Sequence, residues 1–228
     1  MPKPDAALLF AAGFGTRMRP LTDALPKPLV KVAGRPLFDH ALSLVRDAGI
    51  GTVVANTHYL APQMAAHLEQ AGVTQSHEPE ILDTGGGLKA ALPLMPGQAV
   101  LTLNTDAVWT GGNPVKALLD QWDPTRMDAL MMLIDRDRAV GHKGKGDFLV
   151  ADDGRLTYGP GQIYSGLQII KTEPFRVMSE TVFSMHAVWK ALLADNRLFG
   201  MSHDGRWCDV GYPEAIPMAE TMLSDAHV

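Results

Sequence analysis

The chain has 228 residues, of which 46% are hydrophobic and 20% are charged, so it is long enough and apolar enough to bury a full core. Its formal net charge of -5 gives no electrostatic reason to expect a nucleic-acid partner, and no apolar run approaches the length needed to cross a bilayer. The single cysteine, Cys208, excludes an internal disulfide, and the first residues lack the apolar stretch of a signal peptide, so we expect a cytoplasmic protein.

The first half of the chain alternates apolar runs, typical of strands covered on both faces, with amphipathic helical stretches. The predicted elements are a strand at 6–12, a helix at 37–48, a strand at 52–56, a helix at 61–71, a strand at 73–76, a helix at 84–94, a strand at 99–103 and a helix that begins at Asn113-Pro114. This βαβ order is typical of a parallel, doubly wound sheet.

The second half has more hairpin signals and fewer long helices. Its predicted elements are a strand at 129–134, a hairpin from 148–150 and 156–158, a strand at 164–170, helices at 174–178 and 185–194, a second hairpin from 199–203 and 207–210, and a closing helix at 213–224. No linker or repeat separates the halves. We therefore predict one α/β domain over 1–228, with a Rossmann-like, doubly wound mixed sheet and C-terminal β-hairpin and helix insertions.

A loop of small residues follows the first predicted strand. Backbone N–H groups can approach phosphate oxygens closely where no bulky side chain intervenes, and an Arg and a Lys downstream can neutralise those phosphates. The spacing is neither that of a P-loop nor that of a dinucleotide fingerprint, because Met18 stands where the third glycine is needed. The sequence therefore predicts a triphosphate site made by Ala11, Ala12, Gly13, Gly15, Thr16, Arg17 and Lys27.

Two aspartates lie at positions where a carboxylate is expected to bind a ligand, a metal ion or another polar group. Asp106 lies just past the carboxyl end of the strand at 99–103, the edge at which open α/β sheets bind ligands. Asp209 lies inside an otherwise apolar strand, where a carboxylate is costly unless it is paired or metal-bound. The alternatives are a turn-capping role for Asp106 and a backbone hydrogen bond at a strand end for Asp209.

A second glycine-rich segment, Asp83-Thr84-Gly85-Gly86-Gly87, opens a predicted helix. Helix N-termini bind anions, and backbone there can also contact the edge of a base. A flexible glycine-rich turn is the alternative reading. Two readings also stay open for the basic loop 142–147, which contains Lys143 and Lys145: a contact with sugar or phosphate, and a solvated charged loop.

The string Ala11-Ala12-Gly13-Phe14-Gly15-Thr16-Arg17-Met18-Arg19-Pro20-Leu21-Thr22, followed by Pro26-Lys27-Pro28, resembles the entry motif of the sugar-phosphate nucleotidylyltransferases. The resemblance implies the nucleotide-diphospho-sugar transferase fold, with a nucleotide-binding part at about 1–125 and a sugar-phosphate-binding part at about 126–228. It also implies an enzyme that converts an NTP and a sugar 1-phosphate into an NDP-sugar and pyrophosphate. Its partners would be these small molecules, with no nucleic acid or membrane, and it would be a monomer or a small homo-oligomer.

The resemblance assigns roles to particular residues. Arg17 and Lys27 would be catalytic, and Asp106 and Asp209 would hold Mg²⁺ as the cofactor. The nucleobase would be held by Glu78, Thr84, Gly85 and Gly86, and the sugar phosphate by Asn104, Gly146, Asp147, Ser165 and Gly166. Thr105 replaces the usual Gly of the family's Asn-Gly-Asp step, and the Glu-Lys-Pro triplet of hexose-1-phosphate members is missing.

Within the family the chain most resembles the short bacterial uridylyltransferases that act on N-acetylmuramate 1-phosphate in peptidoglycan recycling. The alternative substrate assignment is that of a mannose-1-phosphate guanylyltransferase, because the base-binding segment does not distinguish U from G. A catalytically silent regulatory protein is the alternative of another class, and the retention of both cations and both carboxylates argues against it. An NAD-dependent oxidoreductase would need the missing third glycine.

Overall fold

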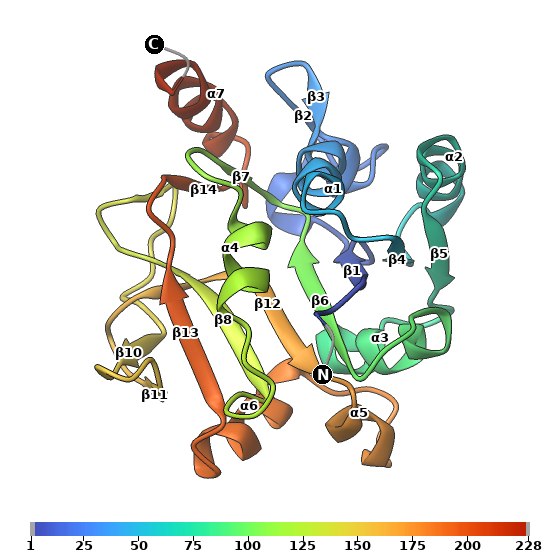
Figure 1. Ribbon diagram of the computed structural model, residues 1–228. Coiled ribbons are helices and arrows are strands. Elements are labelled where there is room, and N and C mark those ends of the chain that lie inside the picture. Colours follow the sequence, from blue (N-terminus) through green and yellow to red (C-terminus); the bar gives the residue numbers. More distant parts are fainter. Residues whose placement is uncertain (1–2, 227–228) are drawn as a thin grey trace.

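The computed structural model describes residues 3–226, which form a mixed seven-stranded sheet covered by helices on both faces (Figure 1). The strand order is β13-β8-β12-β6-β1-β4-β5, and β12 alone runs antiparallel to the other six. These strands are β1 (Ala6–Phe10), β4 (Thr52–Thr57), β5 (Thr74–His77), β6 (Ala99–Asn104), β8 (Ala129–Ile134), β12 (Ile163–Lys171) and β13 (Leu198–Ser202). The predicted mixed, doubly wound α/β sheet is confirmed.

Two hydrophobic clusters, one on each face of the sheet, form most of the core. α1 (Leu37–Asp47), α2 (Ala61–Ala71) and α4 (Pro114–Gln121) pack on one face, and α3 (Asp83–Ala91), α5 (Glu173–Val177) and α6 (Met185–Ala194) pack on the other. Alternate residues of β1 belong to the two clusters, as period-two alternation requires of a strand buried on both sides. The apolar positions of α1 are buried from Leu37 to Val45, whereas Ala48, the last residue of the predicted helix, lies just past α1 and is half-buried.

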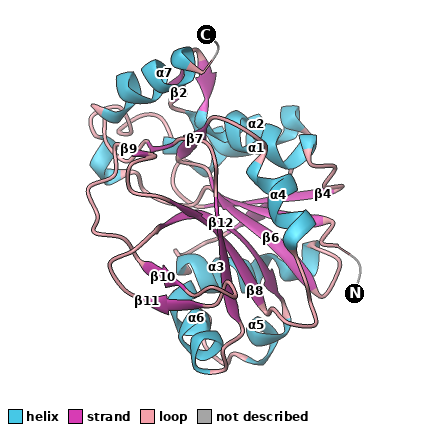
Figure 2. Ribbon diagram, turned by 60° about the vertical axis from the view of Figure 1, so that its left-hand side comes forward, coloured by secondary structure: helices cyan, strands magenta, loops and turns pink. Residues whose placement is uncertain are grey.

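A smaller, three-stranded sheet lies beside the carboxyl ends of the central strands (Figure 2). It has the order β7-β14-β9, from β7 (Ala107–Trp109), β14 (Trp207–Asp209) and β9 (Ala139–Val140), and α7 (Ala215–Asp225) packs against it in a third hydrophobic cluster. The predicted hairpin of β10 (Phe148–Val150) and β11 (Leu156–Tyr158) is confirmed, and a short pair joins β2 (Lys31–Val32) to β3 (Arg35–Pro36).

The second predicted hairpin, from 199–203 and 207–210, is wrong. β13 instead extends the main sheet parallel to β8, and β14 pairs antiparallel with β7 and parallel with β9. The chain does bend at Asp204-Gly205. Burial decides the pairing, because Cys208 of β14 and Val210, which follows it, pack with residues of α7 and β7 in the third cluster. No helix in residues 3–226 has the length and apolar character needed to cross a membrane.

Candidate active site

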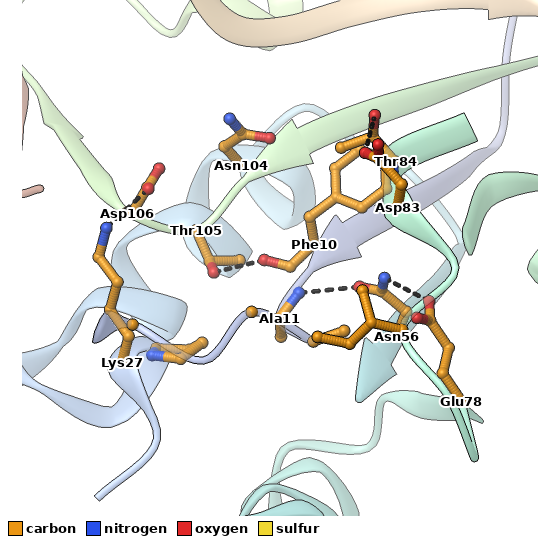
Figure 3. A pocket seen from close by; sticks show the side chains of 15 residues that line it. Phe10, Ala11, Lys27, Asn56, Glu78, Asp83, Thr84, Asn104, Thr105 and Asp106 are labelled. Carbon is orange, nitrogen blue, oxygen red and sulfur yellow. Dashed lines mark hydrogen bonds and ion pairs between the residues drawn. The ribbon is translucent and has the colours of Figure 1, made fainter. Parts of the chain in front are cut away.

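The candidate active site is a pocket of about 290 Å³ at the carboxyl ends of β1, β4 and β6 (Figure 3). Segments far apart in the sequence meet there, at the edge where open α/β sheets form their ligand crevices. Its lining includes the predicted Ala11, Ala12, Gly13, Gly15, Lys27, Glu78, Thr84, Asn104 and Asp106, together with Phe10, Pro28, Asn56, Ile81, Asp83 and Thr105.

The loop after β1 has the backbone freedom that its small residues predict. Gly15 has φ 62°, and a Cβ there would lie 2.9 Å from Lys27 Cβ and 3.1 Å from Thr22 Cγ2, so only glycine fits. Thr22 Oγ1 donates a hydrogen bond to Gly15 O at 2.8 Å, which fixes the turn. Gly13 has nothing within 4 Å of its Cβ position, so its backbone faces open space.

The two predicted carboxylates lie on neighbouring chain segments. β14 pairs with β7 so that Asp209 stands opposite Ala107, and Val210 N donates to Asp106 O at 2.8 Å. Lys27 Nζ makes an ion pair of 2.8 Å with Asp106 Oδ2, and only 12% of the Lys27 side chain is exposed. Lys27, which is half-buried, Asp106 and Asp209 thus form one charged cluster, of which Lys27 and Asp106 line the pocket.

The electrostatics of this cluster favour an added cation. Burial, followed by the charge of Asp106, raises the pKa of Asp209, while Lys27, Arg17 and His142 act in the opposite direction. A Cβ at Gly211 would lie 3.2 Å from Asp209 Oδ1 and 3.3 Å from Arg17 Nη1, so the Arg17 guanidinium also reaches this cluster.

The donor set fits magnesium. Within the described residues 3–226, no group of three or more His, Cys, Asp or Glu side chains is arranged to hold a metal ion. Two neighbouring carboxylates, Asp106 and Asp209, would suit Mg²⁺, which takes one or two protein carboxylates when water and substrate phosphates complete its octahedron. Asp106 and Asp209 are the residues that would hold it.

The predicted base-binding residues are tied into the protein by hydrogen bonds of their own. Glu78 is only 1% exposed, and its two carboxylate oxygens accept hydrogen bonds from Asn56 Nδ2 at 2.7 Å and from Leu82 N at 3.1 Å. Thr84 lines the pocket, whereas the N–H groups of Gly85 and Gly86 both donate to Phe183 O at 3.0 Å. These two glycines therefore pack closely against the 181–183 segment.

A second pocket, of about 620 Å³, opens beside the first and shares four residues with it: Phe10, Asp83, Thr84 and Asn104. The predicted sugar-phosphate residues Gly146 and Asp147 line it, and Asp147 Oδ2 accepts a hydrogen bond from Tyr164 N at 2.8 Å. Its far wall is aromatic and consists of Phe148, Tyr158, Tyr164 and Trp189. Four separate segments contribute this wall, and sequence reasoning placed only the strand that begins at Tyr164 at the sugar pocket.

Ser165 and Gly166, which were predicted to bind the sugar phosphate, do not line the second pocket. Ser165 is buried, and its hydroxyl donates to Met132 O at 2.7 Å. A Cβ at Gly166 would come within 2.7 Å of the Asn104 side chain, so this glycine leaves room for an amide that lines both pockets. Lys143 lies outside both pockets, with its Nζ 4.7 Å from the centroid of the Tyr212 ring, and Lys145 lines neither.

Comparison with known proteins decides the family. A profile of the MobA-like NTP transferase domain matches residues 7–201. The chain belongs to this family. This NTP transferase is 39% identical to an N-acetylmuramate alpha-1-phosphate uridylyltransferase of Caulobacter vibrioides, over 98% of each chain. It is 34% identical to a protein of the same description from Neisseria meningitidis serogroup B, over 90% of this chain and 92% of the relative.

The fold of this NTP transferase also matches that of a solved structure, HddC from Yersinia pseudotuberculosis complexed with GMP-PN. The TM-score is 0.74 at 20% sequence identity, and the match covers 96% of this chain and 99% of the other. At that identity the likeness supports the nucleotidyltransferase fold and nothing finer.

Proposed function

We propose that the protein is a uridylyltransferase that joins UTP to N-acetylmuramate 1-phosphate, with UDP-N-acetylmuramate and pyrophosphate as products. The observation that carries the proposal is the cluster of Lys27, Asp106 and Asp209, with Arg17 beside it, at the end of a glycine-rich loop. The two relatives at 39% and 34% identity support the choice of base and sugar. A role in peptidoglycan recycling follows from that substrate.

The chemistry needs alignment and charge neutralisation more than it needs a base. The nucleophile is a phosphate oxygen of the sugar 1-phosphate, which is already anionic near neutral pH, so no general base has to remove a proton. It attacks the α-phosphorus of UTP, a new P–O bond forms, and the bond to the β-phosphate oxygen breaks with release of pyrophosphate. The protein's task is to hold both phosphates in line and to balance their charge.

The proposed roles follow from position. Backbone N–H groups of the loop from Gly13 to Arg17 cradle the triphosphate, and the exposed Arg17 guanidinium meets the leaving pyrophosphate. Lys27, which is paired with Asp106 in the pocket lining, would meet the α-phosphate. Mg²⁺, held by Asp106 and Asp209, would supply positive charge to the phosphate oxygens when bound.

The sugar would occupy the second pocket. Asn104 lines both pockets and is proposed to contact the sugar phosphate, and Asp147 and Gly146 line the wall that faces the sugar ring. The aromatic wall offers apolar faces to the N-acetyl and lactyl methyl groups. On this assignment the nucleotide contacts come from about 1–125, and most of the sugar contacts come from about 126–228.

Pyrophosphate release across a substrate matrix tests the proposal. UTP, GTP, dTTP and CTP are each paired with the 1-phosphates of N-acetylmuramate, N-acetylglucosamine, mannose and glucose in the presence of Mg²⁺. We expect release confined to, or strongest with, UTP and N-acetylmuramate 1-phosphate. A preference for GTP with mannose 1-phosphate would replace the proposal with the guanylyltransferase assignment, and a folded protein that binds UTP but releases nothing would favour a regulatory role.

A further inference from the structure

One peptide unit, between Phe10 and Ala11, marks the point where β1 ends and the glycine-rich loop begins (Figure 3). Both of its polar groups are hydrogen-bonded to side chains, one from β4 on one side and one from the residue after β6 on the other. Phe10 O accepts a hydrogen bond from Thr105 Oγ1 at 2.7 Å, and Ala11 N donates to Asn56 Oδ1 at 2.8 Å. Side-chain hydrogen bonds thus fix the start of the loop at the point where the backbone pairing of β1 with β4 and β6 ends.

The hydrogen bonds of the Asn56 amide leave it one orientation. Its oxygen must face the Ala11 N–H donor, so its nitrogen faces Glu78, and Nδ2 donates to Glu78 Oε1 at 2.7 Å. The other carboxylate oxygen of Glu78 accepts from Leu82 N at 3.1 Å. Asn56 is 4% exposed and Glu78 is 1% exposed, so this chain of bonds is shielded from water.

Within residues 3–226, the Glu78 carboxylate accepts hydrogen bonds from one side-chain amide and one backbone N–H, and neither donor is a cation. Each carboxylate oxygen therefore accepts one hydrogen bond from the protein itself, and these two bonds from Asn56 and Leu82 fix the orientation of the carboxylate. The same chain links the ends of three adjacent strands, since Asn56 belongs to β4, Glu78 follows β5 and Ala11 follows β1. A shift of Glu78 would be passed through the Asn56 amide to the first peptide of the loop.

We infer that Asn56, Glu78 and Thr105 are positioning residues that fix the Phe10–Ala11 peptide and, through it, the direction of the loop N–H groups. Glu78 acts through Asn56 and not by contact with the nucleobase. Thr105, which departs from the glycine usual at this point of the family motif, supplies the hydroxyl that a glycine would lack. This inference rests on the proposed function in that it takes the loop to be the UTP phosphate site.

Exchange of the amide and the carboxylate tests the inference. Asn56→Asp alone sets two carboxylates against each other, and Glu78→Gln alone sets an amide N–H₂ against the N–H of either Leu82 or Asn56. The double variant N56D/E78Q restores every bond. Its new carboxylate at position 56 would accept from Ala11 N and from the new amide at position 78, and the oxygen of that amide would accept from Leu82 N. Net charge and side-chain volume are kept.

We expect each single variant to raise the Kd for UTP, measured by calorimetry without sugar phosphate, by about tenfold or more. The KM for UTP should rise with it, while the KM for the sugar 1-phosphate stays within about twofold, a split that a general loss of folding would not produce. The double variant should return to within about threefold of the parent. A double variant no better than Glu78→Gln would overturn the inference and assign Glu78 to the base itself.

Variants of Thr105 give a second test, which does not require the N56D/E78Q double variant to fold. Thr105→Val keeps the shape and removes the hydroxyl, whereas Thr105→Ser keeps the hydroxyl. We expect Thr105→Val to weaken UTP binding by about fivefold or more and Thr105→Ser to bind like the parent. Equal UTP affinity in all three proteins would contradict the inference. Absent turnover by the parent with every sugar would refute the proposed function alone, because UTP binding can still be measured.

Discussion

Gly87→Ala should weaken UTP binding indirectly, because it displaces Glu78 and Asn56 and contacts no residue that we assign to the chemistry. A Cβ at Gly87, inside α3, would lie 2.7 Å from Glu78 Oε1 and 3.0 Å from Asn56 Nδ2. The first distance is about 0.7 Å short of the 3.4 Å at which ordinary van der Waals contact begins, so the Glu78 carboxylate has to shift, and we expect its hydrogen bond with Asn56 to open. Overpacking of this kind costs about 1–3 kcal/mol, and the better helix propensity of Ala returns about 1 kcal/mol.

The expected net loss is therefore about 1 kcal/mol, equivalent to a fall in Tm of about 2–4 °C for a chain of this size. The Kd for UTP should rise by about tenfold, because one hydrogen bond to a buried carboxylate is lost. Calorimetric titration and thermal unfolding of Gly87→Ala are compared with Gly112→Ala, whose Cβ position meets nothing within 4 Å. Parent-like UTP affinity in Gly87→Ala would refute the reasoning.

Two further predictions concern carboxylates. Burial and the charge of Asp106 raise the pKa of Asp209, so the fold disfavours its ionised form. Asp209→Asn should therefore keep or raise Tm while the rate of pyrophosphate release falls by about 100-fold or more. Near-full activity of this variant would contradict the assignment of Asp209 as a metal ligand. Burial opposes ionisation of Asp128, but hydrogen bonds from Arg197 and Lys171 outweigh it and lower its pKa. Ionised Asp128 therefore stabilises the folded protein above its unfolded-state pKa of about 3.9, and this stabilisation is lost as pH falls through the folded-state pKa. In urea unfolding at pH 7, the free energy of unfolding of Asp128→Asn should be about 1–2 kcal/mol below that of the parent, and this difference should shrink below about pH 4. A difference in unfolding free energy that stays constant with pH would rule out this account.

The strands of the main sheet could be predicted because each is an apolar run covered on both faces. β1, β4, β6 and β8 all lie within one or two residues of their predicted ranges. The strands β7 and β9 have three and two residues, too few for any periodicity to be visible. The pairing of β14 depends on the third hydrophobic cluster, which only the folded chain brings together, and the local Asp-Gly turn misled the prediction.

Some residues of the candidate site could likewise be predicted from the sequence, and others could not. Lys27, Asp106 and the loop residues were predictable, since they follow buried strands or stand in a contiguous string. Asn56 is the last residue of the predicted strand 52–56 and the next-to-last of β4, so the rule that singled out Asp106 would have singled it out as well. The aromatic wall of the second pocket was not predictable, because Tyr158 and Trp189 come from a hairpin and a helix whose meeting is a property of the tertiary fold.

The fate of the α-phosphate of UTP tests the central claim most directly. The protein is incubated with UTP labelled at the α-phosphorus, N-acetylmuramate 1-phosphate and Mg²⁺, and the products are separated and counted. The proposed reaction predicts that the label passes into a UDP-sugar, with one pyrophosphate released for each UDP-sugar formed. Label that appears in UMP, or that stays in UTP while both substrates are bound, would contradict nucleotidyl transfer to the sugar phosphate.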